Sequence, residues 1–389
     1  MSGKKYQIIK GNALIPIFLT FVVMGFADLA GIATNYIRED YCLSDSTAGF
    51  LPGSLYVWFF ILSVPAGVLM SRIGRRRTVI AGLAAMSLGM VIPMCTTSFH
   101  AMLPAFAFIG AGTTLLGVGL NPLLASLVPD SSLASSMTAG QTVKVLASIA
   151  SPALAALGAT GTICLFGLGW KSIFAIYLVI TAAVAVWLAL TPVEETGMQE
   201  AGSMRECLAL LKVPAVLMAF LAVVCHVGSD VSLNVMLPEI FEKRLGIPLN
   251  SAAFAGSVYF TARLAGSVAG VFVLRRISIR KCLTAGLVLL AAGTILLAAG
   301  HSATALCAAT VLLGLGNANI CTLIISSAFL AVPERRNDIS GLTMMGLSGG
   351  ALFSLMTGFL SSIAGITASL ALILAATAFI FIYAVRHTR

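Results

Sequence analysis

Long apolar runs follow one another along the whole chain, and short polar segments separate them. A helix that crosses a bilayer needs about 20 mostly apolar residues. Cutting the sequence at charged residues and at clusters of Gly, Pro and Ser predicts twelve such runs, at residues 13–37, 47–71, 77–97, 102–127, 138–158, 170–191, 213–238, 249–275, 280–300, 303–327, 338–361 and 363–385. The pattern therefore predicts an all-α membrane protein with twelve transmembrane helices.

The longest polar connection, residues 192–212, divides the predicted spans into two sets of six. Residues 1–191 and 213–389 are thus expected to form two pseudo-symmetric six-helix bundles joined by a cytoplasmic linker. Short strings recur between the halves at an offset of about 202 residues: Gly25-Phe-Ala-Asp28 and Val227-Gly-Ser-Asp230, Gly53-Ser-Leu-Tyr56 and Gly256-Ser-Val-Tyr259, Gly119-Leu-Asn121 and Asn317-Ala-Asn319. Repeated bundles are typical of secondary transporters, which hold their solute near the membrane midplane.

Composition excludes a soluble protein. Hydrophobic residues make up 59% of the 389 positions and charged residues only 10%, against about 25% charged residues in soluble globular proteins. The net charge of +9 is spread over short connections, which favours a lipid bilayer and not nucleic acid as the partner. The eight cysteines stand singly, so neither a disulfide framework nor a metal site is expected, and no cofactor is implied.

The placement of the basic residues predicts the orientation in the membrane. Most of the 23 Lys and Arg lie in the terminal segments or in connections on the same side as the termini. The opposite side carries only Arg38, Lys171, Lys243 and Arg244. Since Lys and Arg are enriched in cytoplasmic connections, both termini are expected in the cytoplasm and the chain in the plasma (inner) membrane.

The connection between the second and third spans carries a specific pattern, Gly67-Val-Leu-Met-Ser71-Arg72-Ile-Gly74-Arg75-Arg76. It resembles the signature loop of the major facilitator superfamily, G-x-x-x-D-R/K-x-G-R-R/K, and the resemblance implies that fold and a loop at a cytoplasmic gate. In such a loop the glycines allow close helix approach and a tight turn, and the arginines anchor it in the cytoplasm. Ser71 departs from the pattern, because the superfamily has an acidic residue there.

Within that superfamily the chain resembles the fucose/galactose/glucose:proton symporter branch. The likeness lies in Asp28 and in the strings Leu43-Ser-Asp-Ser-Thr-Ala-Gly49, Pro65-Ala-Gly-Val-Leu-Met70, Gly117-Val-Gly-Leu-Asn121-Pro122 and Gly140-Gln141-Thr142. It implies proton-coupled import of a sugar. Two positions depart from the branch, since Gly117 stands in place of an acid and Lys144 in place of an amide. The resemblance therefore leaves the coupling and the substrate open.

Four charged residues fall well inside the predicted spans: Asp28, Lys144, Asp230 and Arg263. Charges inside a bilayer are costly and mark solute or ion pathways. Asp28, which shares a helix face with Asn35, is the candidate proton-coupling residue, because a lone acid can bind and release a proton. A static ion pair with Lys144 is the alternative role for Asp28.

The candidate solute ligands are polar residues that the predicted spans carry inside the membrane. Some share a helix face, at i, i+3 in the fifth span and at i, i+4, i+8 in the seventh, and two are repeat-related amides of the fourth and tenth spans. The structural alternatives are hydrogen bonding between helices for Gln141, a bond to a neighbouring backbone for Asn121 and Asn319, and a role in holding Arg263 in place for the polar residues of the seventh span. The candidates are Asn35, Asn121, Gln141, Lys144, His226, Asp230, Asn234, Arg263 and Asn319.

Asp230 and Arg263 lie on consecutive spans with opposite charges, which predicts an ion pair, either direct or through water. With the seventh span ending near Pro238, their depths in the membrane would differ by about 9 Å at a rise of 1.5 Å per residue. A long arginine side chain and some helix tilt would cover much of that difference.

The sequence shows no phosphate-binding loop, nucleotide fold or hydrolytic triad, so we expect no enzyme and an ion gradient as the driving force. We expect a secondary active transporter, working as a monomer, that imports a monosaccharide or a related small polar solute with protons by alternating access. Two alternatives stay open. An anionic solute such as a sugar acid would suit Lys144 and Arg263, and a receptor or scaffold would bind without translocating.

Overall fold

The computed structural model describes residues 2–26, 33, 36–37, 40–42, 50–96, 98–159, 167–193, 203–247, 252 and 254–388, and every regular element in these ranges is a helix. The longer helices are α1 (Ser2–Gly25), α4 (Phe50–Ile73), α5 (Arg75–Cys95), α6 (Phe99–Leu127), α7 (Leu133–Ala159), α8 (Ser172–Leu190), α10 (Pro214–Leu245), α12 (Phe254–Val273), α13 (Ile279–Ala299), α14 (Ala303–Asn317), α15 (Ile320–Ala331), α16 (Arg336–Met345), α17 (Gly349–Ala364) and α18 (Ile366–His387). The short elements are α9 (Met204–Ala209) and the 3-10 turns η2 (Asp130–Ser132), η3 (Gly169–Lys171), η4 (Leu210–Lys212), η5 (Pro333–Arg335) and η6 (Gly346–Ser348).

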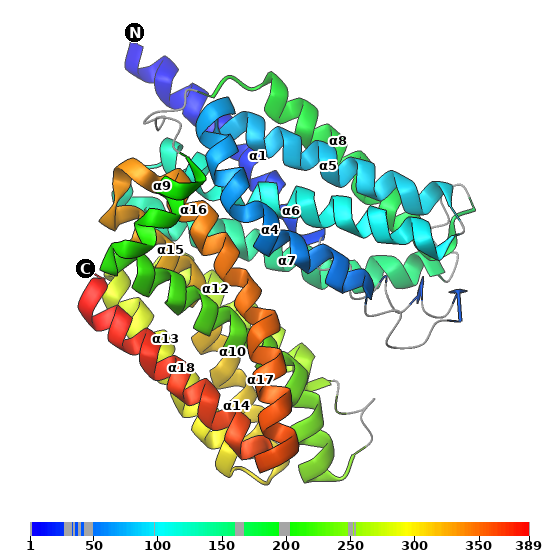
Figure 1. The fold of residues 1–389 in the computed structure, drawn as a ribbon, viewed down its shortest axis with the longest axis vertical. Helices are drawn as coiled ribbons and strands as arrows, with labels where there is room; N and C mark the ends of the chain where they lie inside the picture. The colour runs from blue at the N-terminus through cyan, green and yellow to red at the C-terminus, as the bar shows by residue number, and fades with distance from the viewer. Residues whose placement is uncertain are drawn as a thin grey trace. The chain divides into compact units, whose positions relative to one another are not determined.

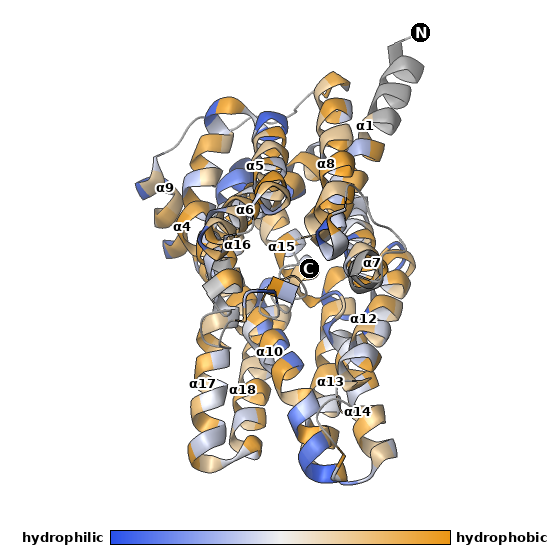
Figure 2. Cartoon of the chain, turned by 90° about the vertical axis from the view of Figure 1, so that its right-hand side faces the viewer, coloured by the Kyte–Doolittle hydropathy of each residue, from blue (hydrophilic) through white to orange (hydrophobic). Residues whose placement is uncertain are grey.

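Within the described residues, nine helical stretches are long and apolar enough to cross a membrane. Two shorter apolar helices, Ala13–Gly25 and Val57–Ile73, add to them. Figure 2 shows hydrophobic residues along α8 and α18, and the strongest hydrophilic colour near the ends of helices. The prediction of a multi-pass, all-α membrane protein is confirmed. The number of twelve spans and their division into two six-helix bundles stay predictions.

The chain forms two compact units. The first contains Met1–Pro129, Val143–Leu208 and Glu334–Met345, and the second contains Asp130–Thr142, Ala209–Pro333 and Gly346–Arg389. Each unit thus includes one short segment from the other half of the sequence. The predicted division into residues 1–191, 192–212 and 213–389 follows the chain and not these packing units, and it stays a prediction.

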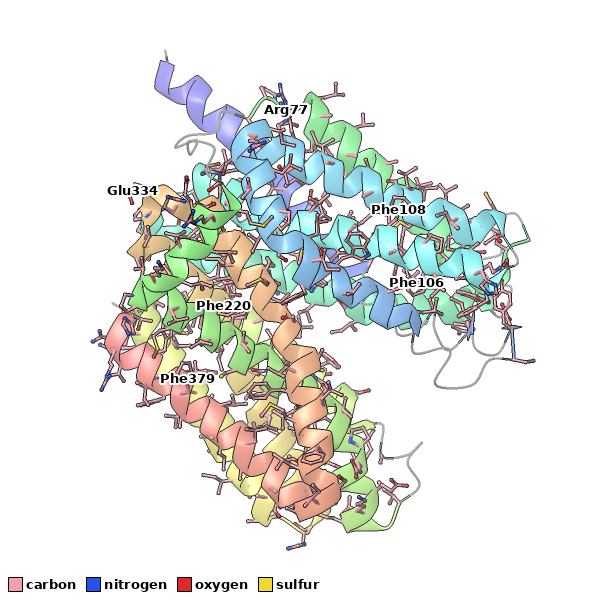
Figure 3. The ribbon with its side chains drawn as sticks, viewed as in Figure 1. Arg77, Phe106, Phe108, Phe220, Glu334 and Phe379 are labelled. Atoms are coloured by element: carbon pink, nitrogen blue, oxygen red, sulfur yellow. The ribbon has the colours of Figure 1, made fainter. Side chains whose placement is uncertain are left out.

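In the first unit α5 and α6 run side by side, with α4 against α6 and α8 against α5 (Figure 1). Glycines allow this close approach, because a Cβ built at Gly112 would lie 2.6 Å from the carbonyl oxygen of Gly82. Small residues of this kind let helix backbones meet in lipid, where van der Waals packing holds helices together. Figure 3 shows Phe106 along α6 and the charged Arg77 and Glu334 near helix ends.

In the second unit α13 and α14 pack together, α12 packs against α14, and α10 packs against α17 and α18. A Cβ at Gly316 would lie 2.7 Å from the carbonyl oxygen of Gly286. These two glycines follow the α5–α6 pair, Gly82 and Gly112, at a spacing of 204 positions (286 − 82 and 316 − 112). The helix contact of one half therefore recurs in the other, in agreement with the predicted internal repeat.

Two arginines at the same spacing stabilise helix ends. Arg76 donates from Nε to the carbonyl of Leu188 at 3.0 Å and also to Ala189, at the end of α8. Arg280 donates from Nε to the carbonyl of Thr388 at 2.8 Å, just after α18. The last carbonyls of a helix lack partners within the helix and carry partial negative charge, so a cation there is favourable.

Helix α10 is longer than the sequence predicted. It continues through Pro238 and ends at Leu245, where Gly246 adopts a positive φ of 65°. The predicted end near Pro238 was wrong, because the polar residues after it form amphipathic helical turns and not a loop. Glu239 and Lys243, one turn apart, form an ion pair of 2.6 Å there.

The tenth and eleventh predicted spans are interrupted. Within residues 303–327, α14 ends at Asn317 and α15 begins at Ile320. Within residues 338–361, the 3-10 turn Gly346–Ser348 separates α16 from α17. Apolar periodicity alone does not reveal such breaks, because the residues on both sides continue the apolar pattern.

Candidate functional site

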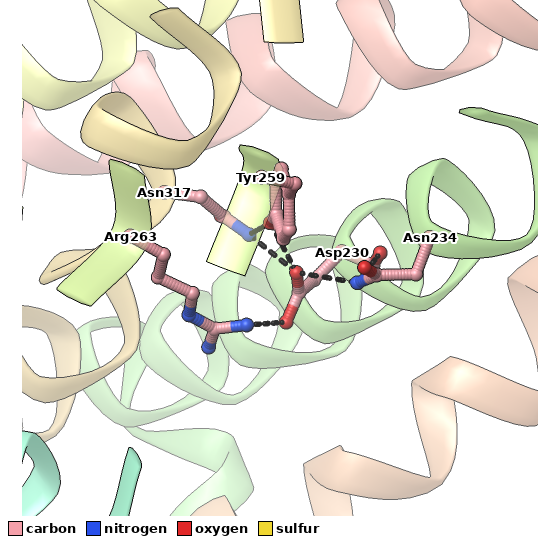
Figure 4. Close-up of polar contacts among 5 residues, drawn as sticks. All are labelled: Asp230, Asn234, Tyr259, Arg263 and Asn317. Carbon is pink, nitrogen blue, oxygen red and sulfur yellow. Dashed lines mark hydrogen bonds and ion pairs between the residues drawn. The ribbon is translucent and has the colours of Figure 1, made fainter. Parts of the chain in front are cut away.

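Polar side chains from three helices meet in the second unit (Figure 4). Asp230 and Asn234 lie one turn apart on α10, Tyr259 and Arg263 lie one turn apart on α12, and Asn317 is the last residue of α14. Residues four positions apart share a helix face, so each of the two longer helices presents two groups to the same point. We call these five residues the Asp230 cluster.

Both carboxylate oxygens of Asp230 have partners. Nη1 of Arg263 lies 2.7 Å from Oδ2 and forms an ion pair with it. Oδ1 accepts hydrogen bonds from the Tyr259 hydroxyl at 2.5 Å, the Asn317 amide at 2.6 Å and the Asn234 amide at 3.2 Å. The Asn317 amide also donates to the Tyr259 hydroxyl. Since every partner of Asp230 is a donor, the arrangement suits a charged carboxylate.

Three buried polar atoms on the residues around this carboxylate have no hydrogen-bond partner among the described residues. They are Nδ1 of His226, one turn before Asp230 on α10, and the amide oxygens of Asn234 and Asn317. The three residues predicted to share a face of the seventh span therefore differ, because Asn234 donates to Asp230 whereas Nδ1 of His226 has no partner among the described residues. Unpaired buried polar atoms are uncommon in native proteins, so these atoms are suited to accept donors such as solute hydroxyls.

The predicted Asp230–Arg263 pair is confirmed, and the contact is direct. The helix end near Pro238, from which the depth of Asp230 was counted, was wrong. Counted from Leu245 and Phe254 at 1.5 Å per residue, Asp230 and Arg263 lie about 22.5 Å and about 13.5 Å from these ends, which again differ by about 9 Å but in the opposite order. Helix ends alone therefore did not locate the pair.

Tyr259 and Asn317 belong to the cluster but were not among the predicted ligands. Both lie in strings that mark the internal repeat, which is the only signal that the sequence offered. From the same strings, Asn319 and not Asn317 was predicted as a solute ligand. The Asn319 amide donates to the carbonyl of Gly266 at 3.0 Å, beside the break between α14 and α15. This bond to a neighbouring backbone is the structural role that was the alternative to solute binding.

The remaining predicted ligands do not join the Asp230 cluster. Asn121 is buried in α6 of the first unit, and its amide oxygen has no partner among the described residues. Gln141 and Lys144 share a face of α7, and Lys144 has no ion partner in the part of the chain that the structure describes. The candidate coupling residue Asp28 and its neighbour Asn35 lie outside the described residues.

The signature loop between α4 and α5 contacts α16 within the first unit. Gly67 lies against the backbone of α16, where a Cβ would lie 3.2 Å from the carbonyl oxygen of Asn337. The buried Arg75 donates from Nε to the side-chain oxygen of Asn337 at 2.8 Å, and the Asn337 amide lies 3.4 Å from the hydroxyl of Ser71. An amide on α16 thus meets both Arg75 and the serine that replaces the usual acid.

The other residues of this loop have local roles. Gly74 has a φ of 92°, so the turn between α4 and α5 requires a glycine, as predicted. Arg72 is exposed in the last turn of α4. Arg76 stabilises the end of α8 as described above.

The linker helix α9 seats a cysteine against α16. Ser203 and Glu206 form a reciprocal capping box at its start, with bonds of 3.2 Å and 3.4 Å. Cys207 is fully buried, and its Sγ lies 3.7 Å from the carbonyl oxygen of Asp338. Burial, aided by the carboxylate of Asp338, raises the pKa of the Cys207 thiol to about 12.

Comparison with known proteins places these features in a family. A model of the Major Facilitator Superfamily matches residues 17–228 and residues 219–389. A glucose/galactose transporter of Brucella abortus is 23% identical over 370 residues, which cover 92% of this chain and 89% of that protein. The L-fucose-proton symporter of Escherichia coli is 28% identical over 108 residues, which cover 27% of this chain and 25% of that protein.

Among solved structures, that of an Escherichia coli fucose:proton symporter variant is similar to this chain with a TM-score of 0.84. The alignment covers 97% of this chain and 100% of that chain at 20% sequence identity. At this identity the likeness concerns the fold.

Proposed function

Because the chain belongs to the major facilitator superfamily, we propose that it is a secondary active transporter that imports a neutral monosaccharide together with protons. The relatives support the substrate class. A glucose/galactose transporter matches over most of both chains, and an L-fucose-proton symporter matches over a shorter stretch. Both are transporters and not enzymes.

The ion pair between Asp230 and Arg263 carries the choice of a neutral solute. It leaves the cluster without net charge, although it contains two ionised groups. A neutral polyol matches such a site, because hydroxyl groups both donate and accept hydrogen bonds. The amide oxygens of Asn234 and Asn317 offer acceptors, and the guanidinium of Arg263 offers donors.

A sugar acid is the second candidate, and Lys144 favours it. This residue lies inside α7 and has no ion partner among the described residues. An unpaired ammonium inside a membrane protein would attract a carboxylate. Lys144 would favour a sugar acid if it faces the solute, and it would leave a neutral sugar as the substrate if it pairs with an acidic side chain such as Asp28.

We assign proton coupling to Asp28. Of the two acids that the sequence predicts well inside spans, Asp230 is held by an arginine and three further donors. Four donors to one carboxylate favour its charged form over its protonated form. Asp28 is then the acid that remains to bind and release the coupling ion.

We assign the contact between the signature loop and α16 to the cytoplasmic side, with both chain termini in the cytoplasm of an inner-membrane protein. In this scheme the bond from Arg75 to Asn337 and the bond from Asn337 to Ser71 close the pathway on that side, and both must break when it opens. Movement of residues 1–191 against residues 213–389 would then give alternating access.

Uptake by the purified protein in sealed proteoliposomes tests the proposal. With an inward proton gradient, at least one labelled neutral hexose should accumulate, and a protonophore should abolish the accumulation. Asp28→Asn should lose accumulation but keep exchange of labelled for unlabelled sugar. Gradient-driven uptake of hexuronic acids alone would support the second candidate. Saturable binding without any uptake would show a receptor and refute transport.

A further inference from the structure

The Asp230 cluster contains two charged residues whose hydrogen-bonding capacities differ. Oδ1 of Asp230 is saturated, because three donors reach it, and Oδ2 is held by the ion pair with the arginine. A solute hydroxyl that approached Oδ1 would have to displace the phenol of Tyr259 or an amide. Asp230 is therefore poorly placed to bind a solute directly.

Arg263 is in the opposite situation. A guanidinium has five N–H donors, and only Nη1 of Arg263 makes a bond, to Asp230, among the described residues. Figure 4 shows the other two nitrogens turned away from the carboxylate. The side chain is 22% exposed, against 13% for Asp230. Since a charged group inside a membrane protein faces the bundle interior or water and not lipid, these donors are available to a solute.

We propose that Asp230 acts as a charge filter: it positions Arg263 and neutralises it, so that Arg263 binds hydroxyl oxygens of a neutral sugar and rejects a carboxylate. This inference rests on the proposed function and names two roles within the same cluster. Arg263 contacts the solute, and Asp230 acts only through Arg263.

The physical basis is the charge that a bound solute would meet. A hydroxyl oxygen accepts from the guanidinium without adding charge to the pair. A carboxylate would place a second anion beside the cation that Asp230 already holds, and like charges repel strongly where water is scarce. With Asp230 replaced by a neutral group of similar shape, the same guanidinium would become an unpaired cation and would attract a carboxylate.

The test measures KM for uptake of a neutral hexose and of the corresponding hexuronic acid in proteoliposomes. Asp230→Asn keeps the shape and removes the charge, so the ratio of the two KM values should shift toward the acid by about tenfold or more. Tyr259→Phe is the matched control, because it removes one donor to Asp230, keeps the ring and leaves both charges in place. Its ratio should stay at the wild-type value.

The double variant Asp230→Asn with Arg263→Gln removes both charges and serves if the single variant does not fold. It should raise KM for the neutral hexose, because the donors are lost, and it should show no shift toward the acid. An Asp230→Asn ratio equal to that of wild type, or an unchanged hexose KM in the double variant, would overturn the charge filter. A wild-type protein that accumulates no neutral sugar would instead refute the proposed function.

Discussion

Replacing Gly316 by alanine should destabilise the second unit, because α14 meets the backbone of α13 at this position. A Cβ there would lie 2.6 Å from the backbone nitrogen of Leu290 and 2.7 Å from the carbonyl oxygen of Gly286, whereas ordinary contacts of a Cβ begin near 3.4 Å. Both neighbours are backbone atoms, so no side-chain rotation relieves the clash. The two helices would have to separate by most of an ångström.

The magnitude follows from two opposing effects. Overpacking of this kind costs about 1–3 kcal/mol, while alanine gains up to about 1 kcal/mol over glycine through helix propensity. Gly358→Ala in α17 is the matched control, because a Cβ there meets nothing within 4 Å and receives only the gain. The difference in unfolding free energy between the two variants should therefore be about 1–3 kcal/mol.

Thermal unfolding of the purified variants in detergent, followed by intrinsic fluorescence, measures this difference as a midpoint several degrees lower for Gly316→Ala than for Gly358→Ala. Gly112→Ala tests the repeat, since its Cβ would lie 2.6 Å from the carbonyl oxygen of Gly82. It should destabilise the protein to a similar extent. Equal midpoints for Gly316→Ala and Gly358→Ala would refute the packing argument.

The remaining predictions concern one candidate ligand, one helix end and one buried thiol. Lys144→Ala should raise KM for uptake more than it lowers the amount of folded protein, and equal losses of both would indicate a structural role. Arg244→Ala should lower the free energy of unfolding by about 1–3 kcal/mol, because Arg244 donates to the carbonyls that end α13, with bonds of 2.5, 2.6 and 3.1 Å; a thermal midpoint equal to that of wild type would contradict this. Cys207 should react with a maleimide far more slowly than the exposed Cys95 from pH 7 to pH 9, because a pKa of about 12 keeps the buried thiol protonated throughout that range. Mass spectrometry of the alkylated protein measures both rates, and equal rates would show that Cys207 is not buried against α16.

The helices were predictable because lipid imposes a simple rule on the sequence. A spanning segment must satisfy its backbone internally and expose apolar side chains, so apolar length alone locates it. The rule fails at helix ends and breaks. Polar turns beyond Pro238 remain helical through local ion pairing, and the break before Ile320 occurs inside an uninterrupted apolar run.

Three of the five members of the Asp230 cluster were predictable: the two charged residues, and Asn234, which lies one turn after Asp230 on the same helix. Asp230 and Arg263 were found because a charge inside an apolar span is rare and needs a partner of opposite sign. Tyr259 and Asn317 carry no charge, so they do not stand out from the apolar pattern of a membrane helix. Their roles depend on three helices converging on one carboxylate, and spacing along the chain does not encode that convergence.

The internal repeat explains why one half carries this chemistry and why sequence symmetry did not reveal it. At the packing offset of 204 positions, Tyr259 corresponds to Leu55, because Gly110 and Gly314 rest on the backbones of these two residues. Arg263 then corresponds to a phenylalanine, Phe59, and the match of Tyr259 with Tyr56 in the sequence is one position out of register. The glycines that set helix contacts recur in both halves, whereas the residues of the Asp230 cluster do not recur at this offset. The repeat thus gives both halves the same helix packing. The buried ion pair of Asp230 and Arg263 belongs to the second half, and the first half has a phenylalanine where Arg263 stands.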